Sequence, residues 1–144
     1  MSIHESASAI SKMLSANDTG ETGAHQAGIL VPKDPTILGF FPVLDTSLKN
    51  PRFYLNFTDD AGERWEFAFI YYNNVFFGGT RNEYRLTRMT PFFHRHGLQP
   101  GDELILQREN PSGRLRIRYR RNRVTSRSES GRLRLGTTWK IIQI

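Results

Sequence analysis

Two stretches of alternating apolar and polar residues, separated by a polar turn, constrain the fold more than any other feature of this chain. Residues 52–57, RFYLNF, and residues 64–72, RWEFAFIYY, flank the turn TDDAGE. Side chains two positions apart in an extended chain lie on the same face, so Trp65, Phe67 and Phe69 share one face of their strand. The pattern therefore predicts an antiparallel hairpin with one face in a hydrophobic core.

Other short segments continue this pattern along the chain. Strands are predicted over 27–32, in the segment that follows the Gly-Gly pair at 78–79, after the turn at 99–102, and over 114–120 and 137–144, whereas 10–16 is compatible with a strand or a helix. Asp34 and Pro35 predict a short helix over 34–41. Thr90, Pro91 and Gly97 predict another over 90–97, with Thr90 as N-cap and Gly97 as C-cap.

About seven strands and two short helices, joined mostly by hairpin loops, favour a mainly β fold with a minor α component. A seven-stranded open β-barrel is the economical arrangement, because closure removes exposed strand edges. An open α+β sandwich is the alternative. A length of 144 residues predicts a single domain over 1–144.

The composition excludes several classes of protein and site. The chain contains no cysteine, so disulfides, thiol catalysis and cysteine-based zinc sites are ruled out. No run of about 18 apolar residues predicts a transmembrane helix. The first 18 residues lack the basic and apolar regions of a secretory signal. We therefore expect a cytoplasmic protein with no membrane partner; the resemblance given below implies a prokaryotic one.

Charge is distributed unevenly along the chain. Residues 1–80 hold five Lys and Arg against nine Asp and Glu, whereas residues 81–144 hold fifteen against five, and fourteen of those fifteen are Arg. Arginine binds phosphate and guanine through a bidentate fork, so the basic half favours nucleic acid as partner. The alternatives are a solvated basic face or a disordered basic stretch over 118–134.

The residues give little support to an enzyme. A common type of metal-dependent nuclease needs an acidic residue two positions before a lysine, and no lysine of this chain has one. His94 and His96 are two apart in a predicted helix, where their side chains diverge, so surface or phosphate-facing histidines are favoured over a metal site. We expect no catalytic residue, no metal and no cofactor.

Residues 79–88, GTRNEYRLTR, place Arg81, Glu83 and Arg85 on one face of an extended segment. Arginine matches the two acceptors of guanine in the major groove, and a carboxylate accepts from the N4 amino group of cytosine. The three side chains thus complement neighbouring G·C pairs. An ordinary ion pair on a strand explains the spacing equally well.

Two segments resemble a known family. Residues 14–33, LSANDTGETGAHQAGILVPK, closely resemble the entry segment of the EcoRII N-terminal effector-binding domain, and residues 79–88 resemble its second DNA-contacting arm. The resemblance implies the DNA-binding pseudobarrel fold, which plant B3 transcription-factor domains also adopt. It further implies a module that grips the major groove with an N-terminal arm, about 20–33, and a C-terminal arm, about 79–88.

The resemblance also implies roles for single residues. Those that match base-reading positions are His25, Gln26, Arg81, Asn82, Glu83 and Arg85. Residues expected at the DNA backbone or in setting the register are Lys33, Thr80, Tyr84, Arg88, Arg95, Arg116 and Arg118, of which the last two have the weakest case. Tyr84 departs from the family pattern, which has a basic residue there, and this departure leaves open whether the target site is the same.

The function expected is that of a sequence-specific, double-stranded DNA-binding domain of a type II restriction endonuclease. The expected target is a short G·C-rich site, CCWGG in related members. We expect no cleavage by this domain, a nuclease domain elsewhere in the same chain or complex, and a monomer. One alternative is a small basic RNA- or protein-binding adaptor that uses Tyr71, Tyr72, Phe76 and Phe77 for stacking. Another is a self-sufficient nuclease with an unfamiliar site.

Overall fold

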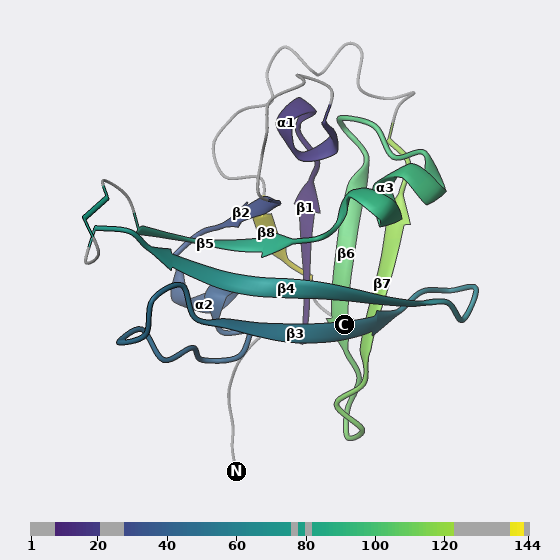
Figure 1. Cartoon of the computed structure of the whole chain (residues 1–144). Helices are drawn as coiled ribbons and strands as arrows, with labels where there is room; N and C mark the ends of the chain where they lie inside the picture. The colour runs from purple at the N-terminus through teal and green to yellow at the C-terminus, as the bar shows by residue number, and fades with distance from the viewer. Residues whose placement is uncertain (1–7, 21–27, 76–77, 80–81, 123–138, 143–144) are drawn as a thin grey trace.

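The computed structural model describes residues 8–20, 28–75, 78–79, 82–122 and 139–142. These residues form eight strands and three short helices (Figure 1). In chain order they are β1 (Ala9–Met13), α1 (Ala16–Thr19), β2 (Ile29–Val31), α2 (Pro35–Leu38), β3 (Arg52–Thr58), β4 (Arg64–Asn73), β5 (Asn82–Thr87), α3 (Thr90–His96), β6 (Glu103–Arg108), β7 (Leu115–Arg120) and β8 (Trp139–Ile141).

All eight strands belong to one sheet with the order β2-β5-β4-β3-β7-β6-β1-β8. The mainly β, open-barrel expectation is confirmed, with eight strands in place of seven. The additional strand is β1, whose sequence pattern is compatible with strand or helix. This segment forms a strand because it pairs antiparallel with β6 on one side and with β8 on the other.

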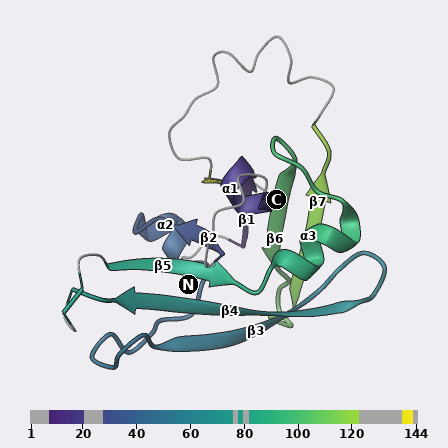
Figure 2. The same cartoon turned by 45° about the horizontal axis from the view of Figure 1, so that its top comes forward.

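The sheet is strongly curled, and its two halves cross at a steep angle (Figures 1 and 2). One half holds β2, β5, β4 and β3, and the other holds β7, β6, β1 and β8. The halves join where β3 and β7 pair in parallel over only two residue pairs, Phe57 with Leu115 and Thr58 with Arg116. At the opposite side, Trp139 Nε1 on β8 donates a hydrogen bond of 2.9 Å to the Leu30 carbonyl on β2. This bond links the two edge strands and brings the curled sheet close to a barrel.

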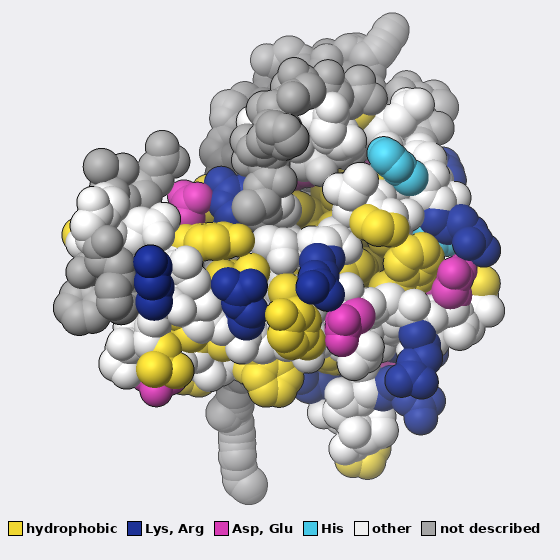
Figure 3. All heavy atoms as spheres, viewed as in Figure 1, with side chains coloured by type: hydrophobic (Ala, Val, Ile, Leu, Met, Phe, Trp, Pro, Cys, Tyr) yellow, Lys and Arg dark blue, Asp and Glu magenta, His cyan; other side chains and the backbone are white. Residues whose placement is uncertain are grey.

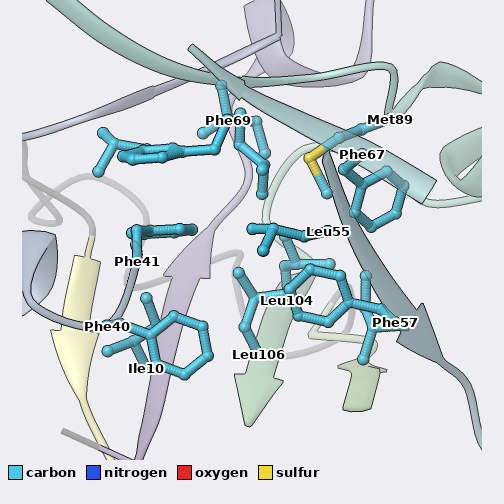
Figure 4. Close-up of a cluster of buried hydrophobic side chains, with 14 of the residues drawn as sticks. Ile10, Phe40, Phe41, Leu55, Phe57, Phe67, Phe69, Met89, Leu104 and Leu106 are labelled. Atoms are coloured by element: carbon cyan, nitrogen blue, oxygen red, sulfur yellow. The ribbon is translucent and has the colours of Figure 1, made fainter. Parts of the chain in front are cut away.

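The hydrophobic core fills the space between the two halves (Figure 4). Phe67 and Phe69 of β4 are fully buried on one face, as their two-residue spacing predicts, and Ala68 and Ile70 on the other face are buried as well. They meet Leu104 and Leu106 from the other half, and Phe41 stacks on Phe69 with ring centroids 4.5 Å apart. Full burial of one such side chain contributes about 1.5–3 kcal/mol to stability, so the core holds the crossed halves together.

Capping residues mark where α1 and α2 begin and where α3 ends. Asp34 accepts a hydrogen bond from the Thr36 amide at the start of α2, as its position before Pro35 predicts. The helix over 90–97 is confirmed, and Gly97 ends it in the left-handed conformation, but Met89, rather than Thr90, occupies the N-cap position of α3. At the start of α1, Ser15 and Asp18 form a capping box. No helix in the described ranges is long and apolar enough to cross a membrane.

Candidate nucleic-acid interface

The structure brings the two predicted arms side by side. β2 and β5 pair antiparallel, with Ile29 opposite Leu86, Leu30 opposite Arg85 and Val31 opposite Tyr84. β2, in the N-terminal arm, therefore lies beside β5, which forms most of the C-terminal arm, although more than fifty positions separate the paired residues in sequence (Figure 1). Four predicted site residues lie outside the described residues: His25, Gln26, Thr80 and Arg81.

Alternation along β5 divides its side chains between the two faces of the sheet. Leu86 is buried in the core, so Tyr84 shares the core face, and Glu83 and Arg85 share the outer face. The structure therefore places Glu83 and Arg85 together, as their spacing predicts. On the outer face they are 22% and 15% exposed, which leaves them partly sheltered from water.

Arg85 joins the two arms through its guanidinium group. Its Nε donates to the Glu83 carboxylate at 2.8 Å, and its Nη1 donates to the carbonyl of Gly28 at 2.9 Å. Gly28 directly precedes β2, so a side chain of the C-terminal arm holds the backbone at the end of the N-terminal arm. Sequence reasoning missed Gly28, because its contact with Arg85 depends on how two distant strands pair.

Tyr84 has a packing role on the opposite face of β5. Its ring lies 4.3 Å from that of Tyr71 and 5.5 Å from that of Phe69, measured between centroids. Burial, and to a smaller extent Tyr71, raises the pKa of the Tyr84 hydroxyl. The ring also lines an open cavity of about 440 Å³ beside α2 and the segment that follows it. Tyr84 thus lies on the other side of the strand from Glu83 and Arg85.

Asn82 stabilises the connection between β4 and β5. Its side-chain oxygen accepts a hydrogen bond of 2.9 Å from the Val75 amide, across the loop that holds Thr80 and Arg81. Asn73, opposite Asn82 on β4, is buried and bonds the 46–50 segment through its side-chain amide. Both asparagines therefore shape the base of the C-terminal arm.

Two of the arginines predicted to contact phosphate, Arg88 and Arg95, have exposed side chains near β4. Arg88 is 56% exposed, pairs with Glu66 at 3.4 Å and lies over the Tyr54 ring at 5.1 Å. Arg95 on α3 is 59% exposed and pairs with Glu63 at 3.1 Å. Figure 3 shows basic side chains distributed over the face formed by β3, β4 and β5, with acidic ones between them. Exposed pairs of this kind contribute little energy.

Three further cations differ in their surroundings. Lys33 is exposed in the short segment between β2 and α2, next to the end of the N-terminal arm. Arg116 and Arg118 lie on β7 in the other half of the sheet, and both pair with Asp60 of the β3–β4 turn, at 3.4 and 3.5 Å. Arg116 also lies 3.5 Å from Glu109. These two arginines brace the junction of the halves and are not brought together with the arms.

A buried polar cluster occupies the β3–β4 turn. Burial alone would raise the pKa of Asp59, but hydrogen bonds from Trp65 Nε1 and from the Glu63 and Ala61 amides, with His96 close by, lower it. His96 packs against Phe92 and lies 3.4 Å from the Asp59 carboxylate, so it is neither a free surface residue nor phosphate-facing. Within the described ranges no three His, Asp or Glu side chains are grouped to hold a metal ion.

Comparison with known proteins identifies the family of this chain. Residues 4–99 match the model of the family described as restriction endonuclease EcoRII, N-terminal. The chain belongs to the EcoRII N-terminal family. It is 41% identical over 86 residues to the type II restriction enzyme EcoRII of Escherichia coli, an alignment that covers 58% of this chain and 21% of that enzyme. It thus corresponds to only a fifth of its bacterial relative.

Plant proteins provide the other similarities. This chain is 30% identical over 110 residues to a B3 domain-containing protein of Oryza sativa subsp. japonica. The alignment covers 76% of this chain and 10% of that protein. Its fold is similar to that in the Arabidopsis FUS3–DNA complex, with a TM-score of 0.60 and 22% sequence identity, covering 77% of this chain and 94% of the other. The structural similarity confirms the B3-like pseudobarrel.

Proposed function

We propose that this chain is a sequence-specific, double-stranded DNA-binding module of a type II restriction endonuclease, acting in target or effector-site recognition. The observation that supports this most is the placement of Glu83 and Arg85 on the outer face of β5, directly beside the end of the N-terminal arm. Membership of the EcoRII N-terminal family and the fold shared with a protein solved on DNA point the same way.

The chemistry of the outer face suits the major groove of a G·C-rich site. Glu83 offers a carboxylate that can accept from the N4 amino group of cytosine, and Arg81 can donate to O6 and N7 of a neighbouring guanine. A carboxylate would repel the phosphate backbone, so a face meant only for phosphate would not favour Glu83. The other proposed base-reading residues are His25, Gln26 and Asn82, together with Arg85, which is bonded to Glu83.

Cations around the arms would place the module on the duplex. Lys33, Thr80, Arg88 and Arg95 are the proposed contacts to phosphate, which fix position and register without reading sequence. Arg116 and Arg118 make a weaker case, because they pair with Asp60 in the other half of the sheet. In this scheme Tyr84 supports the C-terminal arm from the core side.

In this proposal the module binds DNA, and another part of the enzyme cleaves it. The chain corresponds to 21% of EcoRII, so a nuclease domain in the same chain or complex would cut the DNA. A single module with two arms can enclose a short site alone, which favours a monomer. Incubation with plasmid and magnesium should therefore give no cleavage.

A binding titration at fixed physiological salt tests the proposal. One duplex holds CC(A/T)GG, and the other holds the same site with its outer G·C pairs inverted. A preference of about three or more decades for the first falls in the range of specific over nonspecific binding. Equal, salt-sensitive binding calls for a selection from random duplexes. If that selection also returns no preferred sequence, the chain does not recognise a DNA sequence, and an adaptor function is favoured.

A further inference from the structure

The end of the N-terminal arm is fixed to β5 by close backbone packing. Gly28 has a φ of +82°, and a Cβ placed there would overlap the Leu86 carbonyl and come within 2.6 Å of the Thr87 Cα. Only glycine combines this conformation with so close an approach. The backbone at the end of the arm thus lies directly against the strand that presents Glu83.

Arg85 adds a polar link at the same place. Its guanidinium holds the Gly28 carbonyl at 2.9 Å with Nη1 and the Glu83 carboxylate at 2.8 Å with Nε. With Arg85 only 15% exposed, both bonds are stronger than those of a solvated surface pair. We call Gly28, Glu83 and Arg85 the inter-arm clamp.

The start of the N-terminal arm has a separate anchor. Lys12 Nζ on β1 lies 2.6 Å from the Asp18 carboxylate of α1, and both side chains are 9% exposed. Asp18 also accepts from the Ser15 amide at 2.9 Å, and α1 ends at Gly20, directly before the arm. The two described residues that flank positions 21–27 are therefore anchored, Gly20 at the end of α1 and Gly28 in the inter-arm clamp.

We propose that Arg85 is a positioning residue that couples the two arms, orienting the Glu83 carboxylate and the end of the N-terminal arm together. This inference rests on the proposed function, and it changes the role expected of Arg85 from reading a base to setting the geometry of the residues that do. Its consequence is that sequence preference at the base pairs contacted by one arm depends on the other.

A panel of duplexes, each differing from the preferred site by one base pair, tests this coupling. Glu83→Ala and His25→Ala first identify which base pairs depend on each arm. Arg85→Lys keeps the positive charge but cannot make both bonds in the same geometry, so it should reduce preference about tenfold at both sets of base pairs. In the Glu83→Ala background, Arg85→Lys should cause no further loss at the Glu83-dependent pair.

Two more variants separate the clamp from other effects. Gly28→Ala should reduce preference at the His25-dependent pairs more than at the Glu83-dependent pair, because the Arg85–Glu83 bond remains. Arg120→Lys is the matched control. Arg120 lies on β7, pairs with Glu103 at 3.3 Å and has no proposed contact with DNA, so this variant should leave preference unchanged. Thermal unfolding without DNA checks that each variant is folded, and Arg85→Lys suffices if Gly28→Ala fails to fold.

The outcomes distinguish this inference from the proposed function. If Arg85→Lys loses preference at a single base pair that neither other variant affects, Arg85 reads that base directly and the inference is wrong. A uniform loss on every duplex would make Arg85 a phosphate contact and would also overturn it. A wild-type chain that selects no sequence from random duplexes would overturn the proposed function itself.

Discussion

At the scale of single residues, the same type of side chain has different roles according to its face and neighbours. Glu83 is an acidic residue on a face with several arginines. Arg85 bonds its carboxylate, and its side chain is exposed enough to contact a nucleobase. Asp59 is also an acid, but it is buried and accepts hydrogen bonds from the backbone of its own turn. One is therefore a proposed recognition residue and the other a structural one.

Glu83→Ala separates recognition from simple ion pairing. It should weaken binding to the preferred site by about 1–3 kcal/mol and relax preference at one G·C pair. Affinity for unrelated duplex should stay constant or rise, because a charge that repels phosphate is gone. Titration of both duplexes provides the measurement. Equal weakening on both would mean that Glu83 only supports Arg85 and the fold.

Asp59→Asn should reduce stability by about 1–3 kcal/mol at neutral pH, since a charged acceptor of three hydrogen bonds is replaced. The pKa of Asp59 is lowered in the folded protein, so the unfolded chain takes up the proton first as pH falls. The stabilisation is present above the unfolded value, about pH 4, and is lost progressively below it. Urea unfolding between pH 2.5 and 7 measures this, and the free energy of unfolding should depend less on pH in the variant than in the wild type. Asp60→Asn, which changes an exposed residue of the same turn, is the control.

At the scale of elements, the β2–β5 pairing creates the proposed interface. Three residue pairs join strands that belong to different arms, and the outer face of β5 continues into Arg88 and then α3. Exposed arginines along this path are available to phosphate. Those on β7 belong to the other half and are held by Asp60.

Arg95→Ala tests which cations follow the DNA backbone. It should weaken binding to preferred and unrelated duplexes alike and reduce the slope of log affinity against log salt by about one, because one phosphate contact is lost. Arg118→Ala, on β7, should leave the slope unchanged. Titrations at several salt concentrations provide the comparison, and the reverse ranking would place the DNA against the β7 side of the sheet.

At the scale of the whole molecule, closure of the curled sheet rests on few contacts. β3 and β7 pair over two residues, and Trp139 links β8 to β2 by one indole hydrogen bond. β2 is also the strand that ends the N-terminal arm. We therefore expect the stability of the β2–β8 contact to affect the position of the N-terminal arm.

Trp139→Phe removes this hydrogen bond while it keeps an aromatic ring in the core. The free energy of unfolding should fall by about 1–2 kcal/mol, as measured by urea denaturation. Specific DNA affinity should fall as well, because β2 loses a tie to the second half of the sheet. Ile141→Ala, at an exposed position of the same strand, is the control. Full specific affinity in a destabilised Trp139→Phe chain would show that arm position does not depend on closure.

Local pattern alone determined much of this protein. The two apolar segments and the polar turn between them predict the β3–β4 hairpin, the two-residue spacing predicts the common face of Phe67 and Phe69, and Asp34 with Pro35 predicts α2. The spacing of Glu83 and Arg85 predicts their common face. These features depend on residues close in sequence, whose directions follow from the geometry of a strand or the first turn of a helix.

Only the tertiary structure decided the remaining features. β1 became a strand because β6 and β8 pair with it, and His96 became a packed residue because α3 lies over Trp65 and Tyr119. The bond between Arg85 and Gly28 joins positions 57 residues apart. No local pattern encodes such contacts, because they arise when the pairing of distant strands brings two backbones together.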